Sequence, residues 1–212
     1  MYSTDIQWLT HLTSLRYLGL SNVDLSIISY WPRVMNMNAY LRALYLSHCS
    51  LTSASQSILQ LNFTRLEELD LSHNNFNQTL ASCWFWNLTS LKYLDLSGHN
   101  IVGSLPAAVS KFTSLDTLDL SENQLFGSVP YEISEITEKH LAGLKSLKNI
   151  DLSSNHYLKI VVGPEWQPPF KLEVAIFESC QLGPKFPSWL QWMVDIKILD
   201  IWNTGITDQL PH

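Results

Sequence analysis

Residues 115–130 read LDTLDLSENQLFGSVP, with Leu115, Leu118 and Leu120 spaced three and then two residues apart. The same apolar ladder returns along the 212-residue chain at residues 15–20, 41–46, 66–71, 91–96, 115–120, 147–152, 172–177 and 196–201. Successive ladders begin 26, 25, 25, 24, 32, 25 and 24 residues apart. A period of this size predicts a solenoid, in which each repeat packs on its neighbours and no single central core exists.

Each ladder is predicted to form a short strand. Side chains alternate along a strand, so Leu69 and Leu71 point to one side and Asp70 to the other. Stacked repeats would pair these strands into a parallel sheet and bury the leucines. The return half of the repeat carries Gly127 and Pro130, which favour a turn and then a short helix.

The stretch that ends at Pro130 matches L-x-x-L-x-L-x-x-N-x-L-x-G-x-[ILV]-P. This pattern resembles the plant-specific leucine-rich repeat, and residues 88–97 (LTSLKYLDLS) are similar to ectodomains of plant receptor-like proteins of the disease-resistance type, including the xylanase-elicitor receptor group. The resemblance covers essentially the whole chain. It implies an α/β solenoid: a right-handed leucine-rich-repeat superhelix with a parallel β-sheet on the concave face and short 3₁₀ or helical turns on the convex face.

The domain prediction is a single solenoid over residues 1–212, with about eight repeats and no terminal caps. Full receptors of the resembled family begin with a signal peptide and a cysteine-bearing cap, and they end with a second cap, a membrane helix and a short tail. Residues 1–6 do not resemble the start of a signal peptide, and the chain has no apolar run of about 18 residues. We therefore expect a fragment of a protein that acts at the extracellular face of the plasma membrane.

The 32-residue step marks an insertion at residues 131–144. Apolar residues recur there at roughly helical spacing, at Ile133, Ile136, Leu141 and Leu144. One interpretation is that two return halves are joined with the strand between them missing, so that residues 136–137 stand where residues 129–130 stand in the preceding repeat. The alternative is a slightly longer helix on the convex face, since surface segments absorb insertions readily.

The outward residues of the ladders should line one concave face. One row holds four consecutive carboxylates, Asp70, Asp95, Asp119 and Asp151, about 4.8 Å apart by sheet geometry. Such charges raise one another's pKa and favour a cationic partner. The alternative is that this aspartate belongs to the repeat's own Leu-Asp-Leu-Ser pattern and is simply solvated. Catalysis by paired carboxylates is not expected, because nothing would close a water-excluding pocket.

Aromatic residues on the same face are the stronger candidates for ligand contact, because aromatic rings are frequent interface anchors. They are Tyr17, Tyr45, Tyr93 and Trp202. Trp202 stands out because its row is otherwise mostly serine. Tryptophans in the return halves are instead predicted to pack in the core, and these are Trp8, Trp84, Trp86, Trp189 and Trp192.

Three glycosylation sequons begin at Asn62, Asn77 and Asn87. Asn62 and Asn87 each lie four residues before a ladder, and this shared phase supports a secretory origin. A glycan would block docking where it is attached.

The cysteines and the charges exclude several classes of site. Cys49 and Cys180 share a turn position where an asparagine is usual, so they are expected to be buried thiols that donate hydrogen bonds, while Cys83 has no assignment. Cysteine and histidine spacing predicts no disulfide framework, no metal site and no cofactor. The chain has 13 Lys and Arg against 19 Asp and Glu, with no basic run. This pattern argues against binding of nucleic acid.

The favoured function is recognition of a peptide or protein elicitor in plant innate immune or developmental signalling. The resemblance implies a leucine-rich-repeat receptor kinase as co-receptor, since no kinase motif is present. Contact with the membrane would come only through segments that this chain lacks. The alternatives are a secreted inhibitor of microbial cell-wall-degrading enzymes and a non-functional truncated gene product. An enzyme is not expected, because no nucleophile–base pair, phosphate loop or metal cluster is found.

Overall fold

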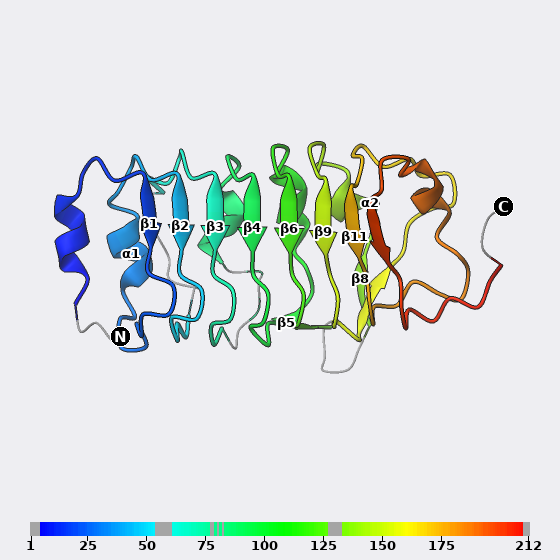
Figure 1. The fold of residues 1–212 in the computed structure, drawn as a ribbon, viewed down its shortest axis with the longest axis horizontal. Helices are drawn as coiled ribbons and strands as arrows, with labels where there is room; N and C mark the ends of the chain where they lie inside the picture. The colour runs from blue at the N-terminus through cyan, green and yellow to red at the C-terminus, as the bar shows by residue number, and fades with distance from the viewer. Residues whose placement is uncertain are drawn as a thin grey trace.

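The computed structural model describes residues 5–53, 61–76, 79, 81, 83–126 and 133–209. Its main sheet has eight parallel strands that lie side by side in chain order along the long axis of the molecule (Figure 1). They are β1 (Tyr17–Gly19), β2 (Ala43–Tyr45), β3 (Glu68–Asp70), β4 (Tyr93–Asp95), β6 (Thr117–Asp119), β9 (Asn149–Asp151), β11 (Val174–Ile176) and β12 (Ile198–Asp200). Each strand lies inside one sequence ladder, and equivalent positions pair, as Leu44 does with Leu18 and Leu69. The predicted α/β solenoid is confirmed.

The ladder leucines form one continuous core between the main sheet and a series of short helices (Figure 1). Leu69 and Leu94 are fully buried, whereas Asp70 and Asp95 on the opposite side of the same strands are half-buried. The helices are η1 (Gln7–His11), α1 (Trp31–Met35), η3 (Trp84–Asn87), η4 (Ala107–Lys111), α2 (Glu138–Leu141) and η5 (Ser188–Trp192). Because side chains alternate along a strand, the face opposite the core stays free for other contacts.

The tryptophans of the return halves divide into two groups. Trp84, Trp86 and Trp189 are buried, as predicted from the sequence. The same prediction is wrong for Trp8 and Trp192, which are 51% and 46% exposed. A helix of about five residues turns only one side toward the core, and in η1 and η5 other side chains already fill that side.

Each strand is followed by a residue in the left-handed conformation, which lets the chain turn sharply out of the sheet. These residues have φ between 52° and 69° and are Asn22, His48, His73, Gly98, Glu122, Ser154, Ser179 and Asn203. Gly98 is the glycine among these left-handed residues, and it has a second role. A Cβ atom there would lie 2.2 Å from Nδ1 of His73, so glycine also leaves room for the neighbouring imidazole ring.

Buried asparagines connect successive repeats just after this turn. The Asn74 side chain is 2% exposed, and its Oδ1 accepts hydrogen bonds from the backbone N–H groups of Cys49 (3.0 Å) and Leu51 (2.9 Å). Its Nδ2 donates to the carbonyls of Leu46 (2.8 Å) and Leu71 (2.7 Å). Asn123 and Asn155 act in the same way in later repeats. Backbone groups that the tight turn would leave unpaired are thereby satisfied.

Cysteines occupy the position of these asparagines in two repeats and replace part of their hydrogen bonding. The thiols of Cys49 and Cys180 donate to the carbonyls of Leu20 (3.1 Å) and Leu152 (2.9 Å), as the sequence predicted. Burial raises the pKa of Cys49 to about 11 and that of Cys180 to about 12. These thiols therefore stay protonated and act as hydrogen-bond donors. Cys83 is also buried, and its thiol lies 3.9 Å from the Thr79 carbonyl oxygen.

Two small parallel sheets lie beyond the ends of the main strands. One pairs β5 (Val102–Gly103) with β7 (Gln124–Leu125), and the other pairs β8 (Ser134–Ile136) with β10 (Leu158–Ile160). Within the predicted insertion, β8 leads directly into α2, which has only four residues. The additional chain length does not lie in this helix. The joining of two return halves stays a prediction, because residues 127–132 fall outside the described residues.

Candidate ligand-binding face

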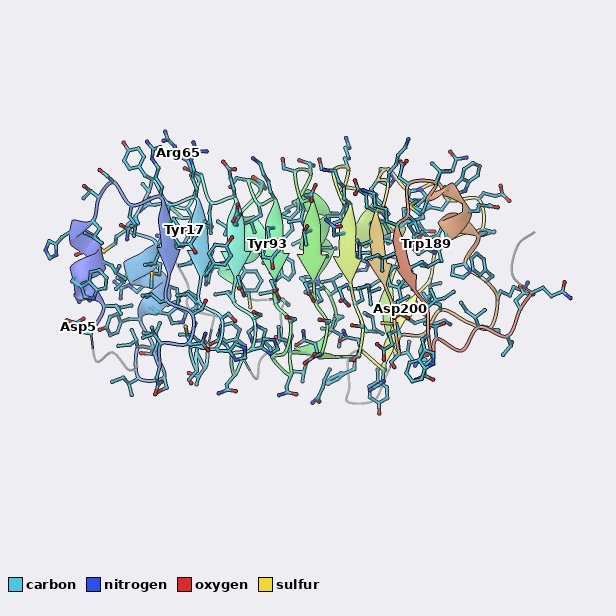
Figure 2. All side chains as sticks on the ribbon, viewed as in Figure 1. Asp5, Tyr17, Arg65, Tyr93, Trp189 and Asp200 are labelled. Carbon is cyan, nitrogen blue, oxygen red and sulfur yellow. The ribbon has the colours of Figure 1, made fainter. Side chains whose placement is uncertain are left out.

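The concave face is defined here as the surface formed by the outward side chains of the eight main strands and of the residue that follows each strand by two positions. The strand register brings the sequence-predicted residues together on this face, in the order Tyr17, Tyr45, Asp70, Tyr93, Asp95, Asp119, Asp151 and Trp202. Tyr17, Tyr93 and Asp200 mark it from the first strand to the last in Figure 2.

The tyrosines lie at the N-terminal end of the concave face. The rings of Tyr17 and Tyr45 are 5.4 Å apart between centroids, and the Tyr45 hydroxyl donates to the carboxylate of Glu68. This hydrogen bond raises the pKa of Tyr45 to about 12, with burial as a second cause. The Tyr93 hydroxyl donates to Oδ2 of Asp95 at 3.2 Å. Tyr45 and Tyr93 are therefore held in place by carboxylates, while Tyr17 is 62% exposed and free to contact a partner.

Each aspartate of the row belongs to the repeat's own Leu-Asp-Leu-Ser pattern, as the alternative interpretation held, and its half-buried carboxylate is also hydrogen-bonded to the turn that follows the strand. In each case Oδ1 accepts hydrogen bonds from both the backbone N–H and the hydroxyl of the serine two residues later. For Asp95 and Ser97 these distances are 2.9 and 2.7 Å, and Asp70, Asp119 and Asp151 make the same pair of bonds. The repeated Asp-x-Ser spacing is the sequence signal for this turn.

Asp119 has the most perturbed carboxyl group of the row. Burial raises its pKa to about 6, with a further contribution from Asp95 and Asp151 on the neighbouring strands, although the Ser121 hydrogen bonds oppose the shift. The outward positions of the main strands, all of them described, contain no Lys or Arg. The concave face is therefore acidic and lacks counter-charges of its own.

We expect Asp119→Asn to stabilise the protein at pH 7 and to reduce its loss of stability between pH 4 and 6. Because the carboxyl pKa is higher in the folded state, the folded state binds a proton more tightly than the unfolded state does. The stability that Asp119 contributes in this way is fully present below the unfolded pKa near 3.9 and is lost as the pH rises through about 6. The asparagine oxygen can still accept from Ser121. Urea denaturation at pH 4, 5, 6 and 7 measures the difference, with the exposed Asp195→Asn as control. A variant that parallels the wild type across this range contradicts the assignment.

The C-terminal end of the concave face carries exposed apolar side chains beside the carboxylates of Glu178 and Asp200. Trp202 is 68% exposed, and its backbone N–H donates to Oδ1 of Asp200 at 3.0 Å, which fixes the start of the turn that carries the ring. Ile198 on the same strand is 53% exposed. The face therefore presents tyrosine rings at one end, carboxylates in the middle and an indole with aliphatic groups at the other end.

Two of the three predicted glycosylation sites can be placed. Asn62 and Asn87 are both exposed and lie shortly before β3 and β4. Asn77 lies outside the described residues. Glycosylation of these asparagines stays a prediction.

Ion pairs follow the leading edge, which we define as the edge of the main sheet where the strands begin and where Arg65 is labelled in Figure 2. Glu67 bridges Arg42 (3.0 Å) and Lys92 (2.7 Å), and Asp116 pairs with Lys148 at 2.7 Å. The hydrogen bond from Lys92 lowers the pKa of Glu67. This pattern was not predicted above, although the charge at the residue after the first ladder leucine alternates in the sequence from Arg42 to Lys197.

Other kinds of site find little support in the described part of the chain. It contains no group of three or more histidine, cysteine or acidic side chains arranged to hold a metal ion. None of its helices combines the length and the apolar character that crossing a bilayer requires. The arrangement can bind a partner through shape, aromatic contact and charge.

Comparison with known proteins agrees with this geometry. The model of a leucine-rich-repeat family matches residues 39–101 and 64–125. Two tomato (Solanum lycopersicum) proteins, receptor-like proteins EIX1 and EIX2, are 47% and 43% identical to the chain over 76 residues. Each match covers 36% of this chain and 7% of the relative, so the chain spans only a small part of their length.

Solved leucine-rich-repeat structures share the fold. The Arabidopsis receptor kinase HAESA, solved in complex with the peptide hormone IDA and the co-receptor SERK1, superposes with a TM-score of 0.63 at 25% identity. The superposition covers 94% of this chain and 35% of the HAESA chain.

Proposed function

We propose that this chain, a leucine-rich-repeat protein related to plant receptor-like proteins, binds a peptide or protein ligand on its concave face. One observation carries the proposal: Tyr17 and Trp202 lie on the concave face and are 62% and 68% exposed. Exposed aromatic rings contribute nothing to the core, whereas they are favourable anchors when a partner covers them.

The chemistry of the face is that of recognition, with no reactive group at its centre. The aspartates are engaged by serine hydroxyls, and the hydroxyls of Tyr45 and Tyr93 are engaged by carboxylates. These hydrogen bonds fix the side chains before a ligand arrives, which lowers the entropy cost of binding. The likeness to HAESA, which holds a peptide hormone, supports a ligand of peptide character.

The wider role that we propose is elicitor or peptide perception in plant innate immune or developmental signalling. The relatives are named receptor-like proteins, and HAESA was solved with a co-receptor, so we propose a leucine-rich-repeat receptor kinase as partner. The extracellular face of the plasma membrane is the corresponding location. The sequons at Asn62 and Asn87, both on exposed residues, support passage through the secretory pathway.

We expect Trp202→Ala to weaken ligand binding by about tenfold or more, because loss of an aromatic anchor at an interface costs about 2 kcal/mol. The probe is a phage-displayed library of 12-residue peptides selected on the immobilised 212-residue chain, followed by affinity measurement on synthetic copies of the selected peptides. Trp192→Ala is the matched control, since Trp192 is 46% exposed but lies on η5, away from the concave face.

The two variants distinguish binding at the concave face from nonspecific binding to exposed aromatic residues. Selected peptides should bind the Trp192→Ala variant with wild-type affinity and compete with one another for one site. If both variants lose affinity equally, or neither does, the concave face around Trp202 is not the ligand site.

A further inference from the structure

The leading edge carries a groove whose charge is opposite to that of the rest of the chain. Its volume is about 560 Å³, and the segments that precede β4, β6, β9 and β11 line it. Four lysines, Lys92, Lys145, Lys148 and Lys171, and a single carboxylate, Asp116, are the charged residues of this lining. The lining thus has a formal charge of +4 − 1 = +3, in a chain whose net charge is −6.

The four lysines meet because the repeats stack. Their positions in the sequence span 80 residues (171 − 92 + 1), yet the strands they precede are neighbours in the order β4-β6-β9-β11. Neighbouring strands are about 4.8 Å apart, so the groove extends roughly 14 Å along the edge. That length corresponds to about four residues of an extended peptide.

Two of the lysines are available for a partner. Lys92 is paired with Glu67 and Lys148 with Asp116, both at 2.7 Å. Lys145 and Lys171 are exposed and have no ion pair with any residue that the structure describes. Their cationic groups therefore remain uncompensated on the rim of the groove.

The backbone that carries these two lysines is fixed. The Lys145 N–H donates to the Gly143 carbonyl, and the next residue, Ser146, donates from its hydroxyl to the Thr113 carbonyl, both at 2.9 Å. Lys171 follows Phe170, which is 4% exposed and packs against Trp166. The lysines are thus presented from rigid turns, which favours binding over a freely moving surface charge.

Both lysines also depart from the repeat pattern. The two residues before the first leucine read Thr-Ser in three repeats, at residues 13–14, 89–90 and 113–114, but Lys-Ser at 145–146 and Phe-Lys at 170–171. The repeat framework does not require a cation at either place. The two described sequon asparagines, Asn62 and Asn87, lie shortly before β3 and β4, and the sequence has no sequon after Asn87. Glycans attached there would leave the lysine groove uncovered.

We infer that this groove binds an acidic polypeptide segment, separately from the concave face. Carboxylate side chains complement the uncompensated lysines, and an extended peptide fits the length of the groove. An acidic saccharide is disfavoured, because the aromatic side chain in the lining, Phe170, is buried and offers no ring for a sugar to stack on. The partner would therefore be a protein with a short run of Asp or Glu residues.

The test uses fluorescein-labelled deca-glutamate and fluorescence anisotropy with the 212-residue chain at 50 and 300 mM salt. We expect saturable binding that weakens at the higher salt, and a loss of at least tenfold in affinity for the double variant Lys145→Glu/Lys171→Glu. The control double variant Lys139→Glu/Lys185→Glu makes the same change in net charge at exposed lysines that do not line the groove, and it should bind like the wild type. Circular dichroism confirms that both variants are folded.

Three results would overturn the inference. The first is an equal loss in both double variants, which would show a general charge effect. The second is the absence of deca-glutamate binding to the wild-type chain at 50 mM salt. The third is tighter binding of oligogalacturonate than of deca-glutamate through the same two lysines, which would assign the groove to an acidic saccharide. Trp202→Ala should leave deca-glutamate binding unchanged, so this test is independent of the concave face.

Discussion

Replacing Asn74 by alanine is expected to lower the free energy of unfolding by about 3–5 kcal/mol. The side chain is 2% exposed, and its oxygen accepts hydrogen bonds from the backbone N–H groups of Cys49 and Leu51. Its nitrogen donates to the carbonyls of Leu46 and Leu71. Alanine would leave these buried groups without partners, and each unsatisfied group costs about 1–3 kcal/mol before relaxation. Water reaches the turn poorly, because neighbouring repeats cover it on both sides.

Urea denaturation of the unglycosylated protein measures this effect. Asn87→Ala is the matched control, since Asn87 is exposed at the end of η3, and its loss should stay within about 0.5 kcal/mol. A change below about 1 kcal/mol in the Asn74 variant would show that the turns obtain their stability elsewhere.

The second large effect concerns His99, which occupies the asparagine column between Asn74 and Asn123. The imidazole is 1% exposed, its Nδ1 accepts from the Asn74 N–H at 3.2 Å, and its ring stacks on Phe76 at 4.7 Å. Burial lowers the pKa of His99 to about 4. The folded protein therefore holds this histidine neutral at pH values where the unfolded chain would protonate it.

Stability should fall as the pH is lowered from about 6.5 toward 4, because the unfolded state then binds a proton that the folded state does not. The unfolded pKa is near 6.5, so this residue should account for a loss of roughly 2–3 kcal/mol between pH 7.5 and 4.5. His99→Asn should remove most of this loss, since asparagine makes the bonds of the column without titrating. Denaturation curves at the two pH values measure the effect.

Exposed His156→Asn serves as the control and should keep the wild-type slope. Asp119 has the opposite pH dependence over part of this range, so the difference between each variant and the wild type is the informative quantity. If His99→Asn and the wild type lose equal stability on acidification, the buried imidazole is not the titrating group.

The comparison of sequence and structure is most instructive at Asp95 and Trp192. The alternation rule placed Asp95 on the outward face, but it did not show that Ser97 would bond the carboxylate, because a hydrogen bond depends on the turn that follows the strand. Trp192 was expected in the core because it lies in the return half of a repeat. Its exposure depends on which side of a five-residue helix meets the sheet.

The lysine groove is a second feature that could not be predicted from the sequence. Lys92, Lys145 and Lys171 are scattered in the sequence, where the absence of a basic run argued only against binding of nucleic acid. Stacking of the repeats places them on one edge. Sequence charge counts average over the chain, whereas a binding partner experiences the local field.

By itself, the sequence determined the solenoid, the eight strands and the identity of the residues on the concave face, because the period of the leucines and the alternation of side chains are local rules. The tertiary structure decided which outward residues are free, which carboxylates and imidazoles have shifted pKa values, and where charges from distant repeats meet. These properties depend on burial and on distances between repeats, and no local pattern encodes them.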